Sequence, residues 1–308
     1  MKKKIIFIIL LLVFIIIGVI TYLTYNNLDK PYSIPTESLA NTNVLSSNAV
    51  CAGEHRSFAI KNDDTLWGWG YLSLDNSQLD ESPIKIMEGV KQIALGYGHN
   101  LVVKTDGSLW AWGFNENGEI GDGTASRYLP FYIGRINNDK QNPVKIMDDV
   151  AFVEAGGIHS LAIKTDGSLW AWGSNFLGQL GDGTNESRTR PVKIMDDVIA
   201  ISAGYYHTLA LKSDGSLWGF GMGYAFGQER QDGDRIEVIR NTPIKIMEDV
   251  VSIGTGLEHS LAIKSDGSLW VFGIRYNTFL SGEGFPENKT PVKILDNVIS
   301  ATAGNGHV

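Results

Sequence analysis

Short apolar runs separated by glycine-rich polar turns recur along most of this chain, and one stretch repeats almost unchanged. The stretch is AGGIHSLAIKTDGSLWAWG at residues 155–173. Close copies occupy residues 52–70, 95–113, 203–221 and 255–273, and a sixth copy begins at residue 303. A period of about 50 residues is typical of solenoids and propellers, in which each copy is one supersecondary unit. Function is therefore to be sought where the copies differ.

Each copy predicts four short strands. The apolar runs 161–164 and 168–173 flank Asp166-Gly167, which predicts a hairpin with a type I′ turn. A further strand is predicted ahead of it at Val150–Ala155, and an edge strand at Pro143–Met147, where the initial proline and the lysine suit an edge. The pattern recurs at Val198–Ala203, Pro191–Met195, and residues 83–87, 243–247 and 291–295. Four strands per period describe one propeller blade.

The full pattern is AG-x-x-H-S-L-A-I-K-x-D-G-S-L-W-A-W-G, followed by N-x-x-G-Q-L-G-D-G-T and P-V-K-I. It resembles the regulator of chromosome condensation repeat family over residues 50–308. The resemblance implies an all-β fold, a β-propeller usually of seven blades that serves mainly as a platform for protein partners. Known members include a nuclear exchange factor for a small GTPase and a secreted bacterial inhibitor of β-lactamases. A fold does not carry its function with it, so neither activity transfers by resemblance alone.

The N-terminus predicts a membrane anchor. Lys2, Lys3 and Lys4 precede an apolar run at residues 5–23, and such a run in helical form spans about 28 Å, close to the hydrocarbon thickness of a bilayer. We expect a cytoplasmic tail at residues 1–4, a single-pass signal anchor at 5–25, a flexible linker at 26–48 and the propeller at 49–308, outside the cell. A cleaved signal peptide is the alternative, and it also exports the repeats.

The charge balance changes the list of partners. The chain has 34 acidic and 26 basic residues, and removing Lys2 to Lys4 leaves 34 − 23, or a net charge of −11, on the remainder. Such a surface disfavours nucleic acid, and no nucleic-acid partner is expected. Cys51 is the single cysteine, so no intrachain disulfide forms. We expect Cys51 to be a small buried residue of a strand.

The histidines and tryptophans belong to the repeat itself. A ring of histidines invites a metal-binding interpretation, but propeller blades hold equivalent positions apart, so we predict that these side chains satisfy blade backbone groups. The tryptophans are predicted to pack as wedges between neighbouring blades, with sugar stacking as the alternative. The structural repeat residues are His99, His159, His207 and His259, with Trp67, Trp110, Trp170, Trp218 and Trp270.

Three other features suggest chemistry only weakly. The stretches 118–124 and 178–184 end in GDGT, but neither a P-loop lysine nor the acid spacing of an EF-hand follows, so we interpret their glycines as turn residues. Asp232 and Asp234 with Glu237 offer too few ligands for calcium. No singular set of nucleophile, acid and base appears. No catalytic residue, metal or cofactor is therefore predicted.

The copies diverge in the loop between W-x-W-G and the edge strand. Because the insertions fall at one position of the repeat, we expect them on one rim of the propeller. Their Tyr, Phe and Arg side chains have the composition of a binding hot spot, although such side chains can also pack within their own loops. The predicted partner-binding residues are Arg127, Tyr128, Phe131, Tyr132, Arg135, Tyr224, Phe226, Arg230, Arg235, Arg275, Tyr276, Phe279 and Phe285.

The hypotheses that follow belong to three classes. The first is an extracellular, membrane-anchored propeller that binds a protein of the cell surface or envelope through this rim. The second is a binder of glycan or cell wall through the same aromatics, and the third is an enzyme such as a hydrolase. The sixth copy stops at Val308. We expect either a truncated ring or a smaller ring in which residues 298–308 lie along the first blade, and we favour the former.

Overall fold

The computed structural model of this chain describes residues 50–53, 55–72, 79–128, 134–226, 238–273 and 291–304. The chain divides into two compact units, Met1–Thr42 and Asn43–Val308, and every described residue belongs to the second. The predicted tail, anchor and linker at residues 1–48 lie outside the described residues. Within the described part, no helix is long and apolar enough to cross a membrane.

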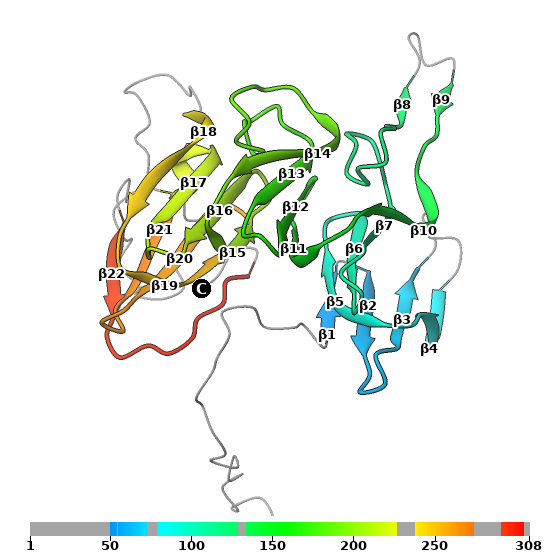
Figure 1. Cartoon of the computed structure of the whole chain (residues 1–308), viewed down its shortest axis with the longest axis horizontal. Helices are drawn as coiled ribbons and strands as arrows, with labels where there is room; N and C mark the ends of the chain where they lie inside the picture. The colour runs from blue at the N-terminus through cyan, green and yellow to red at the C-terminus, as the bar shows by residue number, and fades with distance from the viewer. Residues whose placement is uncertain are drawn as a thin grey trace, which may run out of the picture. The chain divides into compact units, whose positions relative to one another are not determined.

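Five four-stranded antiparallel sheets succeed one another along the described chain, each a blade whose strands pair in chain order (Figure 1). Blade 1 contains β1 (Val50–Ala52), β2 (Arg56–Ile60), β3 (Leu66–Tyr71) and β4 (Leu79–Met87); blade 2 contains β5 (Val90–Leu95), β6 (His99–Lys104), β7 (Leu109–Gly113) and β10 (Lys140–Met147); blade 3 contains β11 (Val150–Ala155), β12 (His159–Lys164), β13 (Leu169–Gly173) and β14 (Arg188–Met195); blade 4 contains β15 (Val198–Ala203), β16 (His207–Lys212), β17 (Leu217–Met222) and β18 (Ile239–Met247); blade 5 contains β19 (Val250–Thr255), β20 (His259–Lys264), β21 (Leu269–Gly273) and β22 (Val292–Leu295). The four-stranded blades predicted from the sequence are confirmed.

Among the described residues, two short elements lie outside the five blades. A separate ribbon, β8 (Arg127–Tyr128) paired with β9 (Arg135–Ile136), forms inside the connection from β7 to β10. A short 3-10 helix, η2 (Gly223–Phe226), follows β17. Both therefore belong to the loop that differs from blade to blade.

The hairpin between the second and third strands differs from the predicted type I′ turn. In blade 2 the amide of Gly107 donates to the Lys104 carbonyl and that of Lys104 to the Ser108 carbonyl, while only Gly107 has a positive φ, 79°. This is the three-residue loop in which a type I turn is followed by a left-handed residue. Asp64 takes that left-handed position in blade 1, with φ 58°. An aspartate can replace the glycine because it tolerates this conformation.

The outer strands of blades 1 to 4 are longer than predicted. β14 begins at Arg188, ahead of Pro191, and its pairing with β13 shifts register between the pairs Ala171–Val192 and Gly173–Arg188. Pro191 thus lies at a bulge and not at the first residue of the strand. A bulge is one of the few places where a sheet accepts a residue that lacks an amide hydrogen.

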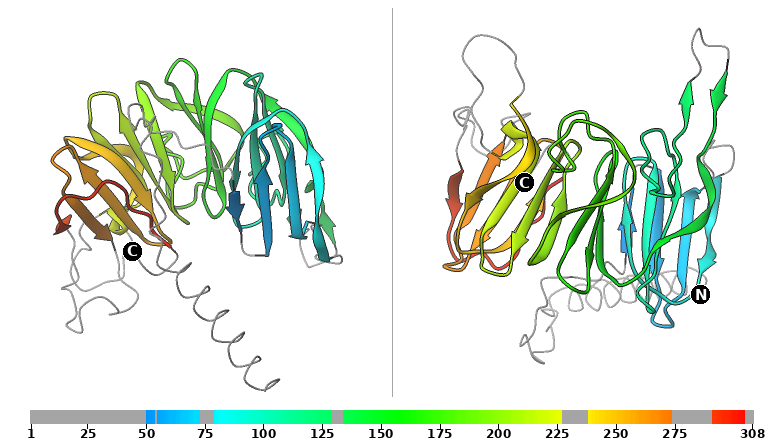
Figure 2. Two further views of the ribbon diagram at one scale, coloured as in Figure 1. Left: turned by 90° about the horizontal axis from the view of Figure 1, so that it is seen from below. Right: turned by 45° about the horizontal axis from the view of Figure 1, so that its top comes forward.

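The hydrophobic core lies between blades. One cluster joins Leu101 and Leu109 of blade 2 to Val153 and Trp172 of blade 3, and equivalent clusters join blades 1 and 2, 3 and 4, and 4 and 5. Figure 2 shows the sheets standing face to face in chain order. Each blade therefore buries its apolar faces against its neighbours, as in repeat architectures generally.

The segment after β22 packs on blade 5. Val298, Ala301 and Ala303 lie against a cluster that contains Leu261 and Leu269. The interpretation in which this segment lies along the first blade does not match these contacts.

Candidate interaction surface

Two connections of each blade vary in sequence: the Gly-x-x-His turn after the first strand and the loop after the third strand. Both lie at the same end of the blade. In an antiparallel meander, the turns after the first and third strands share one end, and the turns after the second and fourth share the other. In blade 3 the register pairs His159, just after the Gly-x-x-His turn, with Gly173, which begins the variable loop. We call this the variable end. The rim geometry predicted from the sequence is confirmed for the described ends of these loops.

The start of each variable loop reaches over the next blade. In blade 3, Leu180 is fully buried beside Phe220 of blade 4. In blade 2, Ile120 shares a cluster with Trp172 of blade 3. We call this arrangement the clasp. A large residue from one blade closes the apolar layer of the next, so the loop contributes directly to the contact between blades.

Phe226 fills the clasp position of blade 4, where it packs beside Phe272 of blade 5. Its side chain is 1% exposed. The prediction that Phe226 contacts a partner is therefore wrong. The short helix η2 begins the connection from β17 to β18, and it places this ring in the core.

The repeated histidines bond to the following blade. His159 Nε2 lies 2.9 Å from Thr208 Oγ1, whose hydroxyl donates to the Gln179 carbonyl at 2.9 Å. Because that hydroxyl proton is used, the ring must be the donor to Thr208. His99 with Ser160 and His207 with Ser260 repeat the arrangement at 3.0 Å. His99, His159 and His207 are therefore structural, but the partner is a hydroxyl of the next blade and not the backbone group that the sequence analysis predicted.

Burial keeps these rings neutral. Desolvation lowers the pKa of His159 to about 3, and it is also the main cause of equally low pKa values at His99 and His207. Gly156 makes room for the ring, because an added Cβ would lie 2.2 Å from His159 Cε1 and 2.7 Å from the Gly204 carbonyl oxygen. The glycine that opens the repeats of blades 2 to 5 is thus required by close packing of successive turns, whereas at Gly53 of blade 1 the nearest atom to an added Cβ would be 3.5 Å away.

Blade 1 has an arginine in the histidine position. Arg56 Nε donates to Asn100 Oδ1 at 2.9 Å, and its terminal nitrogens donate to the carbonyls of Gly96, Tyr97 and His99. Asn100 stands where the later blades have serine or threonine. The pair Arg–Asn therefore replaces the pair His–hydroxyl at this one junction.

The two tryptophan positions have different roles. Trp172 is fully buried between blades, which confirms the predicted wedge for the second ring of W-x-W. The first ring, exemplified by Trp170, is half-buried and donates through Nε1 to Ser168 Oγ at 2.9 Å, while that hydroxyl donates to Asp166. The first ring thus covers the hairpin turn and is not fully buried, although Trp218 also packs against the cluster between blades 3 and 4. Trp67, Trp110, Trp218 and Trp270 make the equivalent bond.

The GDGT turns are occupied by their own chain. Asp182 accepts from Thr184 and from Arg188 Nε at 2.6 Å, and Asp122 pairs with Lys140 Nζ at 2.8 Å. Each acid is thus neutralised by a cation of the outer strand. Among the residues that the structure describes, no cluster of His, Cys, Asp and Glu is placed to hold a metal ion.

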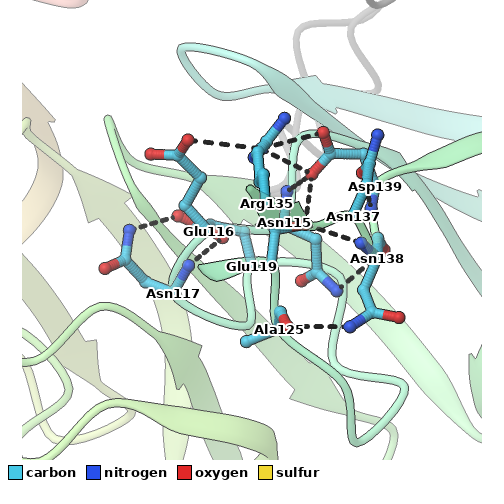
Figure 3. Close-up of polar contacts among 10 residues, drawn as sticks. Asn115, Glu116, Asn117, Glu119, Ala125, Arg135, Asn137, Asn138 and Asp139 are labelled. Atoms are coloured by element: carbon cyan, nitrogen blue, oxygen red, sulfur yellow. Dashed lines mark hydrogen bonds and ion pairs between the residues drawn. The ribbon is translucent and has the colours of Figure 1, made fainter. Parts of the chain in front are cut away.

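A polar network fixes the base of the β8–β9 ribbon, which extends from blade 2 (Figures 1 and 3). Arg135 Nη2 lies 3.0 Å from Asp139 Oδ2 and 3.2 Å from Glu116 Oε1. Asp139 Oδ1 in turn accepts from the amide of Asn115 at 2.9 Å and from Ser126 Oγ at 2.8 Å. Asp139 is nearly buried, which strengthens the pairing with Arg135. The ribbon therefore leaves the blade from a rigid base.

The remaining predicted contact residues divide into two sets. Arg127 is exposed on β8, whereas Arg135 is half-buried in the network at the base of the ribbon. The side chains of Tyr128, Phe131, Tyr132, Tyr224, Arg230, Arg235, Arg275, Tyr276, Phe279 and Phe285 lie outside the described part of the structure. Their role in binding stays a prediction.

A group of aromatic side chains that the sequence reasoning missed lies at the variable end. Tyr97 is 53% exposed and Phe176 is 49% exposed, and Tyr205 and Tyr206 link them. The ring centroids are 6.2 Å apart for Tyr97–Tyr205, 4.4 Å for Tyr205–Tyr206 and 5.7 Å for Tyr206–Phe176. We call these four residues the aromatic patch. The signal in the sequence was the pair of residues between Gly and His in the Gly-x-x-His turns, because these two residues differ from repeat to repeat.

Comparison with known proteins places the fold. The RCC1-like domain family matches residues 24–308. The chain is 28% identical to the ultraviolet-B receptor UVR8 of Arabidopsis thaliana over 146 residues, covering 44% of this chain and 31% of that protein. It is 30% identical to the regulator of chromosome condensation of Xenopus laevis over 170 residues, covering 54% of this chain and 29% of that protein. The matches thus span about a third of these relatives.

Solved structures agree in fold. Yeast RCC1 (Prp20), crystallised with Kap60, superposes with a TM-score of 0.68 at 22% identity, covering 83% of this chain and 64% of that one. Human WBSCR16 gives a TM-score of 0.65 at 20% identity, covering 86% and 73%. At such identities the similarity extends to the fold alone.

Proposed function

The chain belongs to the RCC1-like domain family, and we propose that it is a non-catalytic, protein-binding propeller held outside the cell by an N-terminal membrane anchor. The observation that carries the binding role is the contrast between the two ends of the blades. The Asp-Gly hairpins of blades 2 to 5 are nearly identical, whereas inserted loops, the β8–β9 ribbon and the aromatic patch gather at the variable end. Loops on a rigid scaffold are where binding residues concentrate.

The outward orientation is inferred from the N-terminal sequence. Lys2, Lys3 and Lys4 precede the apolar run at residues 5–23, and positively charged flanks remain in the cytoplasm. The partner is accordingly a protein of the cell surface or envelope. Protease added to intact cells should digest the propeller and spare a tag placed before Lys2. Digestion of neither part until the cells are broken would contradict the proposed orientation.

A loop exchange within the chain tests the binding role. Residues 125–139, which include the β8–β9 ribbon, connect Thr124 to Lys140, and residues 185–187 make the equivalent connection from Thr184 to Arg188. Replacing 125–139 with Asn-Glu-Ser should preserve the blade, because Lys140 and Arg188 hold equivalent aspartates. We expect crosslinked envelope proteins to be lost from this variant. The matched control is Ile84→Ala, an exposed residue of the outer strand β4.

If crosslinking in the loop-exchange variant equals that of the unaltered chain, the ribbon is not the binding element. Glycan binding is the second candidate, favoured by the exposed rings of Tyr97 and Phe176. Pull-down on purified cell wall at high salt separates the two candidates. Ring stacking on sugars persists when salt screens charged contacts between proteins.

A further inference from the structure

We propose that the aromatic patch binds a lysine or arginine side chain presented by an extended segment of the partner protein. This inference rests on the proposed function, because it names the chemistry recognised at the variable end. It uses none of the residues of the β8–β9 ribbon.

The rings of the patch are exposed although the fold has core positions for such rings. Trp172 and Phe220 are fully buried between blades, whereas Tyr97 and Phe176 are about half exposed. A contiguous group of exposed aromatic side chains on a soluble domain marks a site of interaction. The patch joins turns of blades 2 and 4 to the loop of blade 3, so only the assembled propeller creates it.

The angles between the rings favour a cation over a sugar. Neighbouring planes meet at 64°, 64° and 65° for Tyr97–Tyr205, Tyr205–Tyr206 and Tyr206–Phe176. A flat platform for a sugar needs rings that are close to coplanar. Faces inclined to one another instead offer a small cation more than one ring to contact, as in cages that bind ammonium groups.

The patch is held in place before a partner arrives. The amide of Tyr97 donates to the Gly157 carbonyl at 3.1 Å and that of Tyr205 to the Leu257 carbonyl at 3.3 Å. Gly157 lies beneath Tyr205, since an added Cβ would be 2.6 Å from the ring. A tyrosine has two side-chain torsions, so fixing it on binding costs little entropy. Preorganised rings of this kind raise affinity.

Charge complementarity identifies the partner as cationic. The chain has 34 acidic and 26 basic residues, and aromatic faces are themselves negative. Glu258 directly follows Leu257, which bonds to Tyr205. The guanidinium of Arg56 is near Tyr97, but its nitrogens donate to backbone carbonyls and to Asn100. The negative ring faces and the net negative charge of the chain therefore favour a lysine or arginine of the partner.

The test uses the full chain and a short glycine-serine peptide that carries lysine and arginine. The comparison peptide has glutamine at those positions. We expect the cationic peptide to bind more tightly, and Tyr97→Leu to weaken that binding about 2- to 30-fold, the range expected when one cation–π contact is lost. Tyr97→Phe should retain the binding, since it keeps the ring. Ile84→Ala is the control for an unrelated exposed side chain.

Three results would overturn the inference. Equal affinity for the two peptides would show that a cation is not recognised. Unchanged binding by both Tyr97→Leu and Phe176→Leu would show that the aromatic patch is not the binding site. Binding of soluble cell-wall oligosaccharide, or self-association in sedimentation, that is lost in Tyr97→Leu assigns the patch to a glycan or to a second copy. The loop exchange at residues 125–139 leaves the patch in place, so this inference and the proposed function can fail separately.

Discussion

At the scale of single residues, one buried histidine binds neighbouring blades together at each junction from blade 2 to blade 5. His159 is fully buried and bonds to Thr208 of the next blade. We predict that His159→Ala lowers the free energy of unfolding by about 2–3 kcal/mol, because a buried hydroxyl loses its donor and a cavity remains. Urea denaturation measures the change. His55→Ala, at an exposed histidine, is the matched control and should be close to neutral.

The same bond can be tested as a pair. The double variant His159→Ala with Thr208→Ala should be more stable than the sum of the two single losses predicts, with a coupling of about 0.5–3 kcal/mol. Strictly additive losses would show that the hydrogen bond between the blades contributes nothing, and that His159 acts only by filling space.

At the scale of elements, the variable loop has a structural half and an exposed half. Leu180 is fully buried in the clasp, whereas Phe176, four residues earlier, is 49% exposed. We predict that Leu180→Ala lowers the free energy of unfolding by about 2–5 kcal/mol, since it leaves a cavity against Phe220. Phe176→Ala should stay within about 0.5 kcal/mol of the unaltered protein.

Hydrogen exchange locates the effect of the clasp. Leu180→Ala should speed exchange in β16, whose Thr208 bonds to the Gln179 carbonyl beside Leu180. Exchange in β2, in blade 1, should be unchanged if the junctions act locally, as in repeat proteins. Equal acceleration in every blade would mean that the propeller opens as one unit.

At the scale of the whole molecule, the buried titratable groups make stability depend on pH. Burial lowers the pKa of His99, His159 and His207 from 6.5 to about 3, so below pH 6.5 the unfolded state binds up to three protons that the folded state excludes. Desolvation also raises the pKa of Glu154 to about 7, so the folded state binds one extra proton between pH 4.5 and 7.

For these four groups the net difference is about two protons, and their contribution to stability should fall by roughly 3 kcal/mol per pH unit as the pH drops from 6 toward 4.5. Urea midpoints at pH 7.5, 6 and 5 measure the slope. Glu154→Gln removes the opposing proton and should make the fall steeper. A midpoint that stays constant from pH 7.5 to 5 would contradict the burial of neutral histidines.

Local pattern accounts for much of the molecule. The strands Val150–Ala155 and Val198–Ala203 coincide with those predicted, because the pattern of apolar residues and the turn residues that define a strand are adjacent in the sequence. The turn type and the bulge at Pro191 were missed, since they depend on which φ angles and register the paired strands select. Comparison of the repeated copies also distinguished the shared blade residues from the variable loops, and the common position of those loops predicted the rim.

What only the tertiary structure decided is how side chains from different blades meet. In the sequence, Phe226 is an aromatic residue of a variable loop and was predicted to contact a partner. In the structure, η2 places its side chain in the core beside Phe272. Tyr97 and Tyr205 are more than one hundred positions apart, and the stacking of blades brings their rings within 6.2 Å over Gly157. The sequence alone determined the blade, because its information is local and repeated. The surface formed between blades is set by long-range packing, which no single repeat contains.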